Sequence, residues 1–288
     1  MTHISGRVAV VTGAGSGIGR ALAYELARQG ARLAISDVDE VGLAETARQV
    51  RVIGADVRER RLDVTDRTAV LAYADDVVRD FGTVNIVINN AGIAFTGDIE
   101  AMTFEQIERV MDVDFWGVVN GTKAFLPHLI ASGDGHVVNI SSLFGIMSVP
   151  GQGAYNAAKF AVRGFTEALR QEMIAEGHPV QVTCVHPGGI KTNIARNAGA
   201  TDARDQAALA QLFDKKLART SAKSAARIIL RAVRNDRARV LVGFDAKALD
   251  LLVRLLGSGY QRLVSYSTKK IGVATETEKP AVTERVSA

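Results

Sequence analysis

The stretch that decides the fold is Thr12-Gly13-Ala14-Gly15-Ser16-Gly17-Ile18-Gly19, which follows the apolar run RVAVVT at residues 7–12. Glycine permits positive φ angles and lets a backbone approach a pyrophosphate closely. The helical pattern that follows at 18–29 would offer this anion free N–H groups and the positive end of the helix dipole. Ile18 occupies the place of the last glycine in the common fingerprint G-x-G-x-x-G. A purely structural glycine turn is therefore the alternative, which the flanking strand and helix disfavour.

The rest of the chain repeats this strand-helix alternation. Seven short runs rich in β-branched residues are expected as strands, at 7–12, 32–36, 60–64, 84–89, 136–141, 180–186 and 239–242. The helical segments between and after them are 18–29, 39–50, 66–81, 103–131, 153–176 and 221–235. Most of the runs are continuously apolar at their centres, which is typical of parallel strands covered on both faces. The pattern predicts an α/β protein with a single doubly wound Rossmann domain and a seven-stranded parallel sheet.

Composition excludes several other classes of protein. The 288 residues are 47% hydrophobic and 23% charged, as in a globular protein rather than a disordered or low-complexity chain. Lys+Arg 35 less Asp+Glu 31 is +4, too small for the whole chain to indicate nucleic-acid binding. Cys184 is the single cysteine, which favours a reducing compartment. We find no signal peptide and no apolar stretch of 18 residues, and therefore expect a cytoplasmic enzyme.

The chain organisation follows from where the alternation stops. Residues 1–244 are expected to form the domain, in which 191–220, following Pro187-Gly188-Gly189, would be a lid over the substrate. Residues 245–272 are expected to be a C-terminal helical extension. Residues 273–288 have little apolar content and are expected to be a disordered tail.

Asp37 ends the second expected strand, 18 residues after Gly19. A carboxylate here can accept hydrogen bonds from the ribose hydroxyls of the cofactor and would repel a 2′-phosphate, which favours NAD over NADP. Alternatively Asp37 caps the next helix, although Asp39 is better placed for that. Arg20 would suit either cofactor, as a cation near the pyrophosphate.

Tyr155 and Lys159 are four residues apart in a helical pattern, so their side chains share one face. A free tyrosine has a pKa near ~10, and a neighbouring ammonium lowers it. Ser142 lies 13 residues earlier, at a strand end, where its hydroxyl can hold a substrate oxygen. The alternative is a solvated surface pair of Tyr155 and Lys159.

The chain resembles the short-chain dehydrogenase/reductase family over residues 7–192, in the order and spacing of its motifs. These motifs are TGAGSGIG, Asp37, Asn89-Asn90-Ala91-Gly92, Ser142, Tyr155-x-x-x-Lys159 and Pro187-Gly188. The resemblance implies a Rossmann-fold, homo-oligomeric oxidoreductase that acts on small alcohols and ketones, with helices 103–131 and 153–176 as contact faces. It implies a cofactor site made of Gly13, Ser16, Gly17, Ile18, Gly19, Asp37, Asp63, Val64, Asn90, Ala91, Gly92, Tyr155, Lys159, Pro187, Gly188, Ile190 and Thr192.

The resemblance also implies catalytic roles. Tyr155 would be the general acid/base, Lys159 would lower its pKa and hold the nicotinamide ribose, and Ser142 would orient the substrate oxygen. Asp114 departs from the family pattern, which usually has asparagine there to help hold a proton-relay water. The nearby Asn120 should point elsewhere. We interpret Asp114 as a relay member; an inactive dinucleotide-binding sensor or scaffold is the rival hypothesis.

Other residues receive plainer interpretations. His186 is expected to be a packed strand-end residue and Cys184 a small core side chain. The remaining histidines lack metal-ligand spacing, so no metal is expected. The cations at 219–239 are interpreted as a solvated helix face, the alternative being a patch for an anionic membrane or an acyl carrier such as CoA. The leucine-rich stretch 245–265 predicts a subunit contact or pocket wall rather than membrane-surface binding, and suggests an apolar substrate, lipid-derived or steroid-like.

Overall fold

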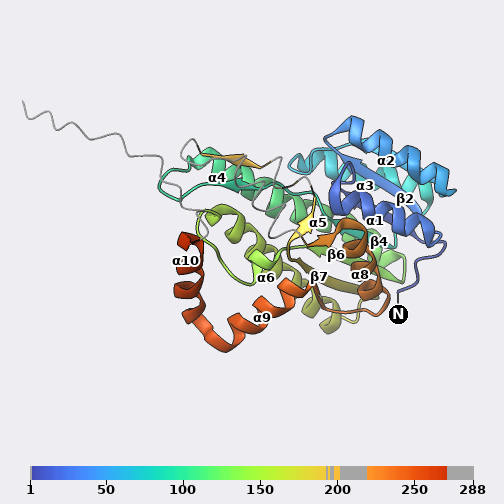
Figure 1. Ribbon diagram of the computed structural model, residues 1–288. Helices are drawn as coiled ribbons and strands as arrows, with labels where there is room; N and C mark the ends of the chain where they lie inside the picture. The colour runs from blue at the N-terminus through green and yellow to red at the C-terminus, as the bar shows by residue number, and fades with distance from the viewer. Residues whose placement is uncertain (1, 193, 195–197, 202–218, 271–288) are drawn as a thin grey trace, which may run out of the picture.

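The structure is a computed structural model that describes residues 2–192, 194, 198–201 and 219–270. Its centre is a seven-stranded parallel sheet in the order β11-β7-β6-β4-β1-β2-β3 (Figure 1). The strands are β1 (Val8–Thr12), β2 (Arg32–Asp37), β3 (Val57–Arg61), β4 (Ile86–Asn89), β6 (Gly135–Ile140), β7 (Val180–Pro187) and β11 (Arg239–Val242). The chain runs outward from β1 to β3 and then returns to place β4 on the other side of β1. Ligands bind at this kind of switch point, at the carboxyl ends of the strands. The predicted doubly wound sheet is confirmed.

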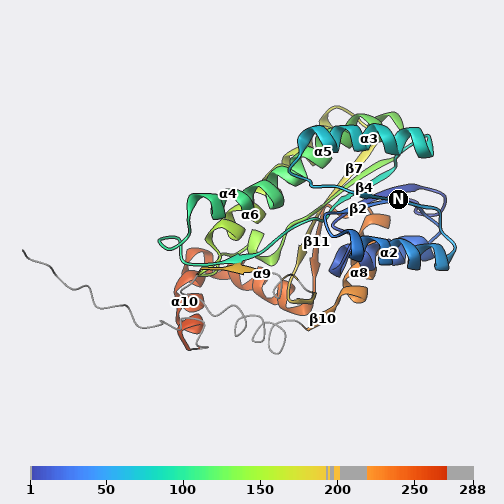
Figure 2. The ribbon, with the colours of Figure 1, turned by 90° about the horizontal axis from the view of Figure 1, so that it is seen from above.

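Helices cover both faces of the sheet (Figure 2). One face carries α1 (Gly17–Arg28), α2 (Glu40–Ile53) and α8 (Ala222–Arg234), and the other carries α3 (Arg67–Phe81), α5 (Gly117–Ala131) and α6 (Gly153–Ala175). Alternate strand residues serve opposite faces, as the pleat requires: Ala9 and Val11 pack toward α1, whereas Val8 and Val10 pack toward α3 and α5. Burial on both faces explains the continuously apolar strands of the sequence.

Two expected elements were wrong. The third strand is Val57–Arg61 rather than 60–64, because it lies at the sheet edge with only Val57 buried. The apolar residues that suggested the later position, Leu62 and Val64, are buried just after the strand. The expected helix 103–131 is divided into α4 (Phe104–Met111), a π-helical turn (Asp112–Trp116) and α5. A π turn inserts one extra residue, which apolar spacing does not reveal.

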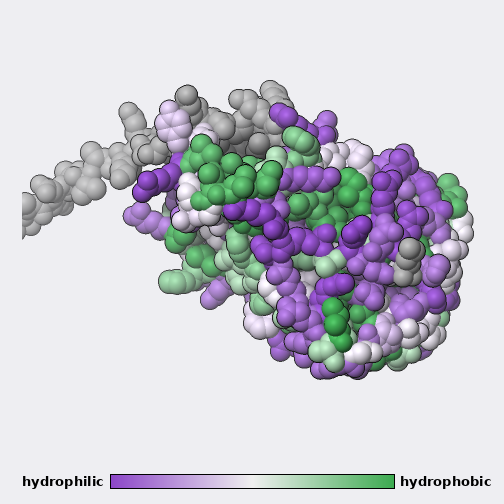
Figure 3. Space-filling view, turned by 90° about the horizontal axis from the view of Figure 1, so that it is seen from below, coloured by the Kyte–Doolittle hydropathy of each residue, from purple (hydrophilic) through white to green (hydrophobic). Residues whose placement is uncertain are grey.

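The chain continues beyond β11 in two helices, α9 (Phe244–Leu256) and α10 (Tyr260–Lys270). They pack against the segment that follows β6, where the Tyr260 hydroxyl accepts a hydrogen bond from the backbone N–H of Ser148 at 3.0 Å. The outer side of these helices exposes apolar side chains, and Figure 3 shows apolar residues gathered at this end of the molecule. They include Leu251, Leu255, Leu256 and Leu263.

The expected lid is described only at its two ends. There β8 (Ile190–Lys191) pairs with β10 (Thr220–Ser221), and β5 (Phe95–Thr96) pairs with β9 (Gly199–Ala200). The rest of this segment and the expected tail 273–288 lie outside the described residues. Within the described ranges, no helix is both long and apolar enough to cross a membrane.

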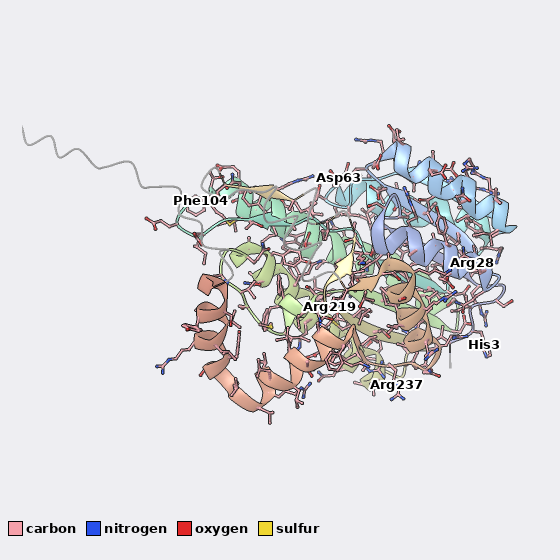
Figure 4. All side chains as sticks on the ribbon, in the orientation of Figure 1. His3, Arg28, Asp63, Phe104, Arg219 and Arg237 are labelled. Carbon is pink, nitrogen blue, oxygen red and sulfur yellow. The ribbon has the colours of Figure 1, made fainter. Side chains whose placement is uncertain are left out.

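The basic helix α8 presents its cations outward. Its Lys223, Arg227 and Arg231 are exposed, as is Arg219 just before the helix (labelled in Figure 4), whereas Ala225, Ile229, Ala232 and Val233 are buried. Arg227 forms an ion pair with Glu25 of α1 at 3.3 Å. This is the arrangement expected of an amphipathic helix with a solvated outer face.

Candidate active site

Ser142, Tyr155 and Lys159 lie at one place in the fold, where β6 ends and α6 begins. The Ser142 Oγ accepts a hydrogen bond from the N–H of Phe144 at 3.1 Å, and the nearby Ser142 side chain tends to lower the pKa of Tyr155. The Phe144 ring meets the Tyr155 ring edge to face, with centroids 6.1 Å apart. The short helical segment Leu143–Gly145 thus follows Ser142 and carries the ring that packs on Tyr155.

Lys159 reaches the tyrosine from one turn further along α6. Its Nζ lies 5.4 Å from the centroid of the Tyr155 ring and donates a hydrogen bond to the carbonyl of Ile140 at 3.3 Å. Burial raises the pKa of Tyr155, and the Lys159 charge opposes that effect. The surface-pair alternative is excluded, because Lys159 is only 3% exposed.

Asp114 enters the site from the π-helical turn and is fully buried. Its Oδ2 lies 3.1 Å from the Nζ of Lys159, and its Oδ1 accepts a hydrogen bond from the N–H of Ile93 at 2.7 Å. Gly92 packs directly on this ion pair, since a Cβ there would lie 3.4 Å from both Asp114 Oδ1 and Lys159 Nζ. Asn120 instead donates to the carbonyl of Val64 at 2.9 Å, away from the lysine as expected.

The pKa of Lys159 reflects this contact. Burial alone would lower it, but the Asp114 carboxylate and Tyr155 outweigh burial and raise the pKa of the ammonium. Lys159 therefore stays charged, and its charge is shared between a carboxylate and a phenol.

The glycine turn between β1 and α1 is tightly packed. Gly13 has a φ of +65°, and a Cβ at Gly19 would lie 2.1 Å from the carbonyl oxygen of Gly13. Asn90 fastens the turn by donating to the carbonyls of Thr12 and Gly13 at 2.9 and 3.1 Å. The Thr12 hydroxyl accepts hydrogen bonds from the N–H groups of Asn90 and Ala91 at 3.0 and 3.1 Å. Residues 89–92 thus support the turn from the neighbouring strand.

The start of α1 suits an anion. Ser16 is the N-cap residue but makes no capping hydrogen bond with its side chain, so the first N–H groups of the helix are not satisfied in that way. Gly17 begins the helix with a φ of +54°, and a Cβ there would lie 3.3 Å from Thr192. Ile18 packs toward the core instead of the turn, which explains why a glycine is not needed at this position. These features fit the pyrophosphate of a dinucleotide.

Asp37 lies beside this turn at the end of β2. Its Oδ2 accepts a hydrogen bond from the N–H of Gly15 at 2.7 Å, and its Oδ1 accepts one from the N–H of Asp39 at 2.9 Å. Asp39 is the N-cap of α2, accepting from the N–H of Gly42 at 3.0 Å. The alternative that Asp37 caps this helix is therefore wrong. Asp37 instead contacts the glycine turn directly, through the N–H of Gly15.

The Arg20 side chain donates hydrogen bonds to the backbone of the glycine turn and of α2. Its guanidinium donates to the carbonyls of Gly15 and Gly42, and its Nε donates to the Thr46 hydroxyl at 2.9 Å. The guanidinium thus connects the glycine turn to α2. This geometry favours a structural role for Arg20 over a role as a cation for the pyrophosphate.

Asp63 and Val64 follow β3 (Figure 4 labels Asp63). The Asp63 Oδ1 accepts hydrogen bonds from the N–H and the hydroxyl of Thr65 at 3.0 and 2.8 Å. Burial tends to raise the pKa of Asp63, but these hydrogen bonds outweigh it and the pKa is lowered. Its free oxygen and the buried Val64 stand next to β2 in the sheet order, on the adenine side that the family pattern implies.

The segment after β7 returns over the glycine turn. The N–H of Gly188, next to Pro187, donates to the carbonyl of Val242 at 2.9 Å, and Gly189 donates to Asp245 Oδ2 at 2.6 Å. Ile190 is buried, and Thr192 reaches Gly17. Asp245 was missed in the sequence, because it lies 56 residues from Gly189 and stands outside every motif.

His186 and Cys184 are buried, as expected for packed strand residues. His186 is fully buried, donates from Nδ1 to the Ser142 carbonyl at 2.9 Å, and has its pKa lowered to about 4 by burial. Burial also raises the pKa of Cys184 to about 12, as expected of a core thiol. Across the described ranges, no three His, Cys, Asp or Glu side chains gather as a metal site would require.

Comparisons with known proteins agree with this geometry. The short chain dehydrogenase family matches residues 7–203, and the chain therefore belongs to the short-chain dehydrogenase/reductase family of oxidoreductases, whose members use NAD or NADP. Its relatives include the putative oxidoreductase SadH of Mycobacterium tuberculosis, 62% identical over 270 residues, which are 94% of this chain and 98% of that protein.

Two further proteins are less similar in sequence to this chain. Estradiol 17-beta-dehydrogenase 11 of Macaca fascicularis is 37% identical over 195 residues, 67% of this chain and 65% of that protein. A short-chain dehydrogenase/reductase from Burkholderia phymatum, solved in complex with NAD, is 31% identical with a TM-score of 0.84, covering 91% of this chain and 97% of that one.

Proposed function

We propose that this protein is an NAD-dependent oxidoreductase that interconverts a secondary alcohol and a ketone. The observation that carries the proposal is the convergence of Ser142, Tyr155 and Lys159 where β6 ends and α6 begins, beside the switch point of the sheet. The bound nicotinamide accepts or donates the hydride at its C4. The chain must therefore bind it, hold the substrate oxygen and move one proton.

Tyr155 moves that proton. In alcohol oxidation its oxygen takes the hydroxyl proton of the substrate, and in ketone reduction it returns a proton to the carbonyl oxygen. Ser142 lies two residues before Phe144, whose ring packs on Tyr155, and it orients the same substrate oxygen. Lys159 favours the phenolate through its charge and would hold the ribose of the nicotinamide half.

The Asp37 carboxylate supports a preference for NAD over NADP. It stands at the end of β2 within hydrogen-bonding distance of the glycine turn, where its negative charge would repel a 2′-phosphate and its oxygens would accept from ribose hydroxyls. The neighbour from Burkholderia phymatum, described in complex with NAD, supports the same choice.

An apolar substrate is the second part of the proposal. The Tyr155 ring is flanked by Phe144, which belongs to the apolar cluster that α9 and α10 form with residues 143–149. An apolar wall beside the reacting hydroxyl suits a lipid-derived or steroid-like alcohol. The similarity to estradiol 17-beta-dehydrogenase 11 supports this class. We also propose that the enzyme is a homo-oligomer.

The test is NADH formation over a panel of secondary alcohols, from cyclohexanol to estradiol. Tyr155→Phe should lower kcat by at least about 10²-fold while NADH still binds, as measured by its fluorescence. Tyr24→Phe, in α1, is the matched control and should keep full activity. Undiminished turnover in Tyr155→Phe would contradict the proposed role, and NADH binding without turnover by the unaltered protein would favour the sensor or scaffold.

A further inference from the structure

We propose that Asp114 is a positioning residue whose carboxylate neutralises Lys159 inside the site and thereby keeps Tyr155 protonated at neutral pH. The inference rests on the proposed function and concerns the direction and pH range of that reaction. It differs from the relay role suggested by the sequence, because Asp114 acts here through a direct ion pair with Lys159.

The ion pair is built into the fold. Asp114 is fully buried and Lys159 is 3% exposed, with Oδ2 and Nζ 3.1 Å apart. The N–H of Ile93 holds the other carboxylate oxygen at 2.7 Å, and the carbonyl of Ile140 holds the ammonium at 3.3 Å. Both partners are fixed from separate elements, so neither can turn toward solvent without breaking a hydrogen bond to the backbone.

The π-helical turn Asp112–Trp116 brings the carboxylate to this position. The backbone N–H of Gly117 donates a hydrogen bond to the carbonyl of Asp112, five residues earlier, whereas an α-helical N–H bonds the carbonyl four residues earlier. The extra residue changes the phase of the helix at Asp114. Its neighbour Asp112 is exposed, which makes Asp112 a control of the same charge in the same turn.

Counting charges shows what the carboxylate does. Burial raises the pKa of Asp114, whereas the Lys159 charge and the hydrogen bond from Ile93 oppose that effect and favour the carboxylate. With Asp114 ionised, Asp114, Lys159 and protonated Tyr155 sum to zero, and losing a proton from the pair of Tyr155 and Lys159 leaves a net charge of −1 in a buried place. With a neutral side chain at position 114, the same loss takes the site from +1 to zero. Burial disfavours net charge, so the carboxylate makes deprotonation harder.

This argument does not depend on which group releases the proton. Tyr155 and Lys159 are close enough to titrate as a coupled pair, and removing a nearby negative charge lowers both macroscopic pKa values. Among the residues that the structure describes, the other titratable groups facing the cluster are Cys184 and His186 of β7. Burial keeps both neutral around pH 7, with pKa values of about 12 and about 4.

The consequence is a preference for one protonation state. Protonated Tyr155 is the form that donates to a carbonyl oxygen, and the phenolate is the form that takes a proton from an alcohol. An enzyme with Asp114 should therefore reduce ketones efficiently at neutral pH, and it should need alkaline conditions to oxidise alcohols.

The test compares Asp114→Asn with Asp112→Asn. The first readout needs no cofactor: the protein is labelled with [13Cζ]tyrosine, and the resonance missing from Tyr155→Phe is titrated by NMR. The second readout is the pH dependence of kcat/KM for cyclohexanol oxidation with NAD. Asp114→Asn should lower the apparent pKa by at least one unit in both, giving about tenfold more base form at a given pH, whereas Asp112→Asn should change neither.

An unshifted titration in Asp114→Asn would overturn the inference, because it would mean that Asp114 carries no charge that Tyr155 senses. Asp114→Ser provides a second neutral replacement if the asparagine variant fails to fold. Asp114→Glu restores the charge and should restore the higher pKa. If the unaltered protein oxidises and reduces nothing, the proposed function fails, yet the NMR titration still decides the role of Asp114.

Discussion

Replacing Gly19 by alanine tests whether the glycine turn is built for close backbone approach. An ideal Cβ at Gly19 would lie 2.1 Å from the carbonyl oxygen of Gly13 and 2.6 Å from the Nδ2 of Asn90. Neither atom is free to move, because Asn90 itself donates to the carbonyls of Thr12 and Gly13. Relief of the overlap requires a displacement of about 1 Å, in a turn that is fastened on both sides.

Overpacking of this kind costs about 1–3 kcal/mol, and the backbone partner places Gly19→Ala at the upper end of that range. For a chain of this size, about 3 kcal/mol corresponds to a fall in Tm of roughly 6–12 °C. The displaced turn should also weaken NADH binding by about tenfold or more, since ~1.4 kcal/mol of lost contact is enough.

The assays are thermal denaturation and fluorescence titration with NADH. Gly164→Ala is the matched control, since Gly164 is exposed in α6 and no atom lies within 4 Å of its ideal Cβ. This control should be stabilised by about 0.5–1 kcal/mol, because alanine loses less backbone entropy than glycine in a helix. A Gly19→Ala protein with unchanged Tm and unchanged NADH affinity would refute the packing argument.

The other predictions concern the cofactor and pH. Asp37→Asn keeps an acceptor for the Gly15 N–H but removes the charge, so kcat/KM with NADP should rise relative to that with NAD by about tenfold or more; an unchanged ratio would mean that Asp37 does not face the 2′-position. His136 and His186 have pKa values of about 4 in the folded protein against 6.5 as reference, so the unfolded chain binds more protons below pH 6.5. Stability is therefore full above pH 6.5 and falls as pH approaches 4, by about 3 kcal/mol per histidine. Urea denaturation at pH 7.5 and 4.5 checks this, and His136→Asn should show a smaller difference between the two pH values than the unaltered protein.

Much of the fold and the site could be predicted because both depend on local patterns. Burial on both faces makes the central strands continuously apolar, so β1, β2, β4, β6 and β7 were visible as runs. The predicted glycine turn, Ser142, and the pair Tyr155 and Lys159 come together because each lies at the end of a strand or the start of a helix at the switch point.

Elements with weak local patterns were misplaced. β3 lies at the sheet edge and is charged along most of its length, so its neighbours Leu62 and Val64 appeared to be the strand. The π-helical turn at Asp112–Trp116 adds one residue within a single turn, a break too short for apolar spacing to reveal, and it was therefore predicted as part of one long helix.

By itself, the sequence determined the α/β class, the doubly wound parallel sheet, the glycine turn and the residues available for proton transfer, because these depend on spacing along the chain. Only the tertiary structure decided that Asp114 meets Lys159 at 3.1 Å and that Asp245 holds Gly189. The physical reason is that these contacts join residues 45 to 56 positions apart. Their distances are set by how helices pack on the sheet, which no local pattern encodes.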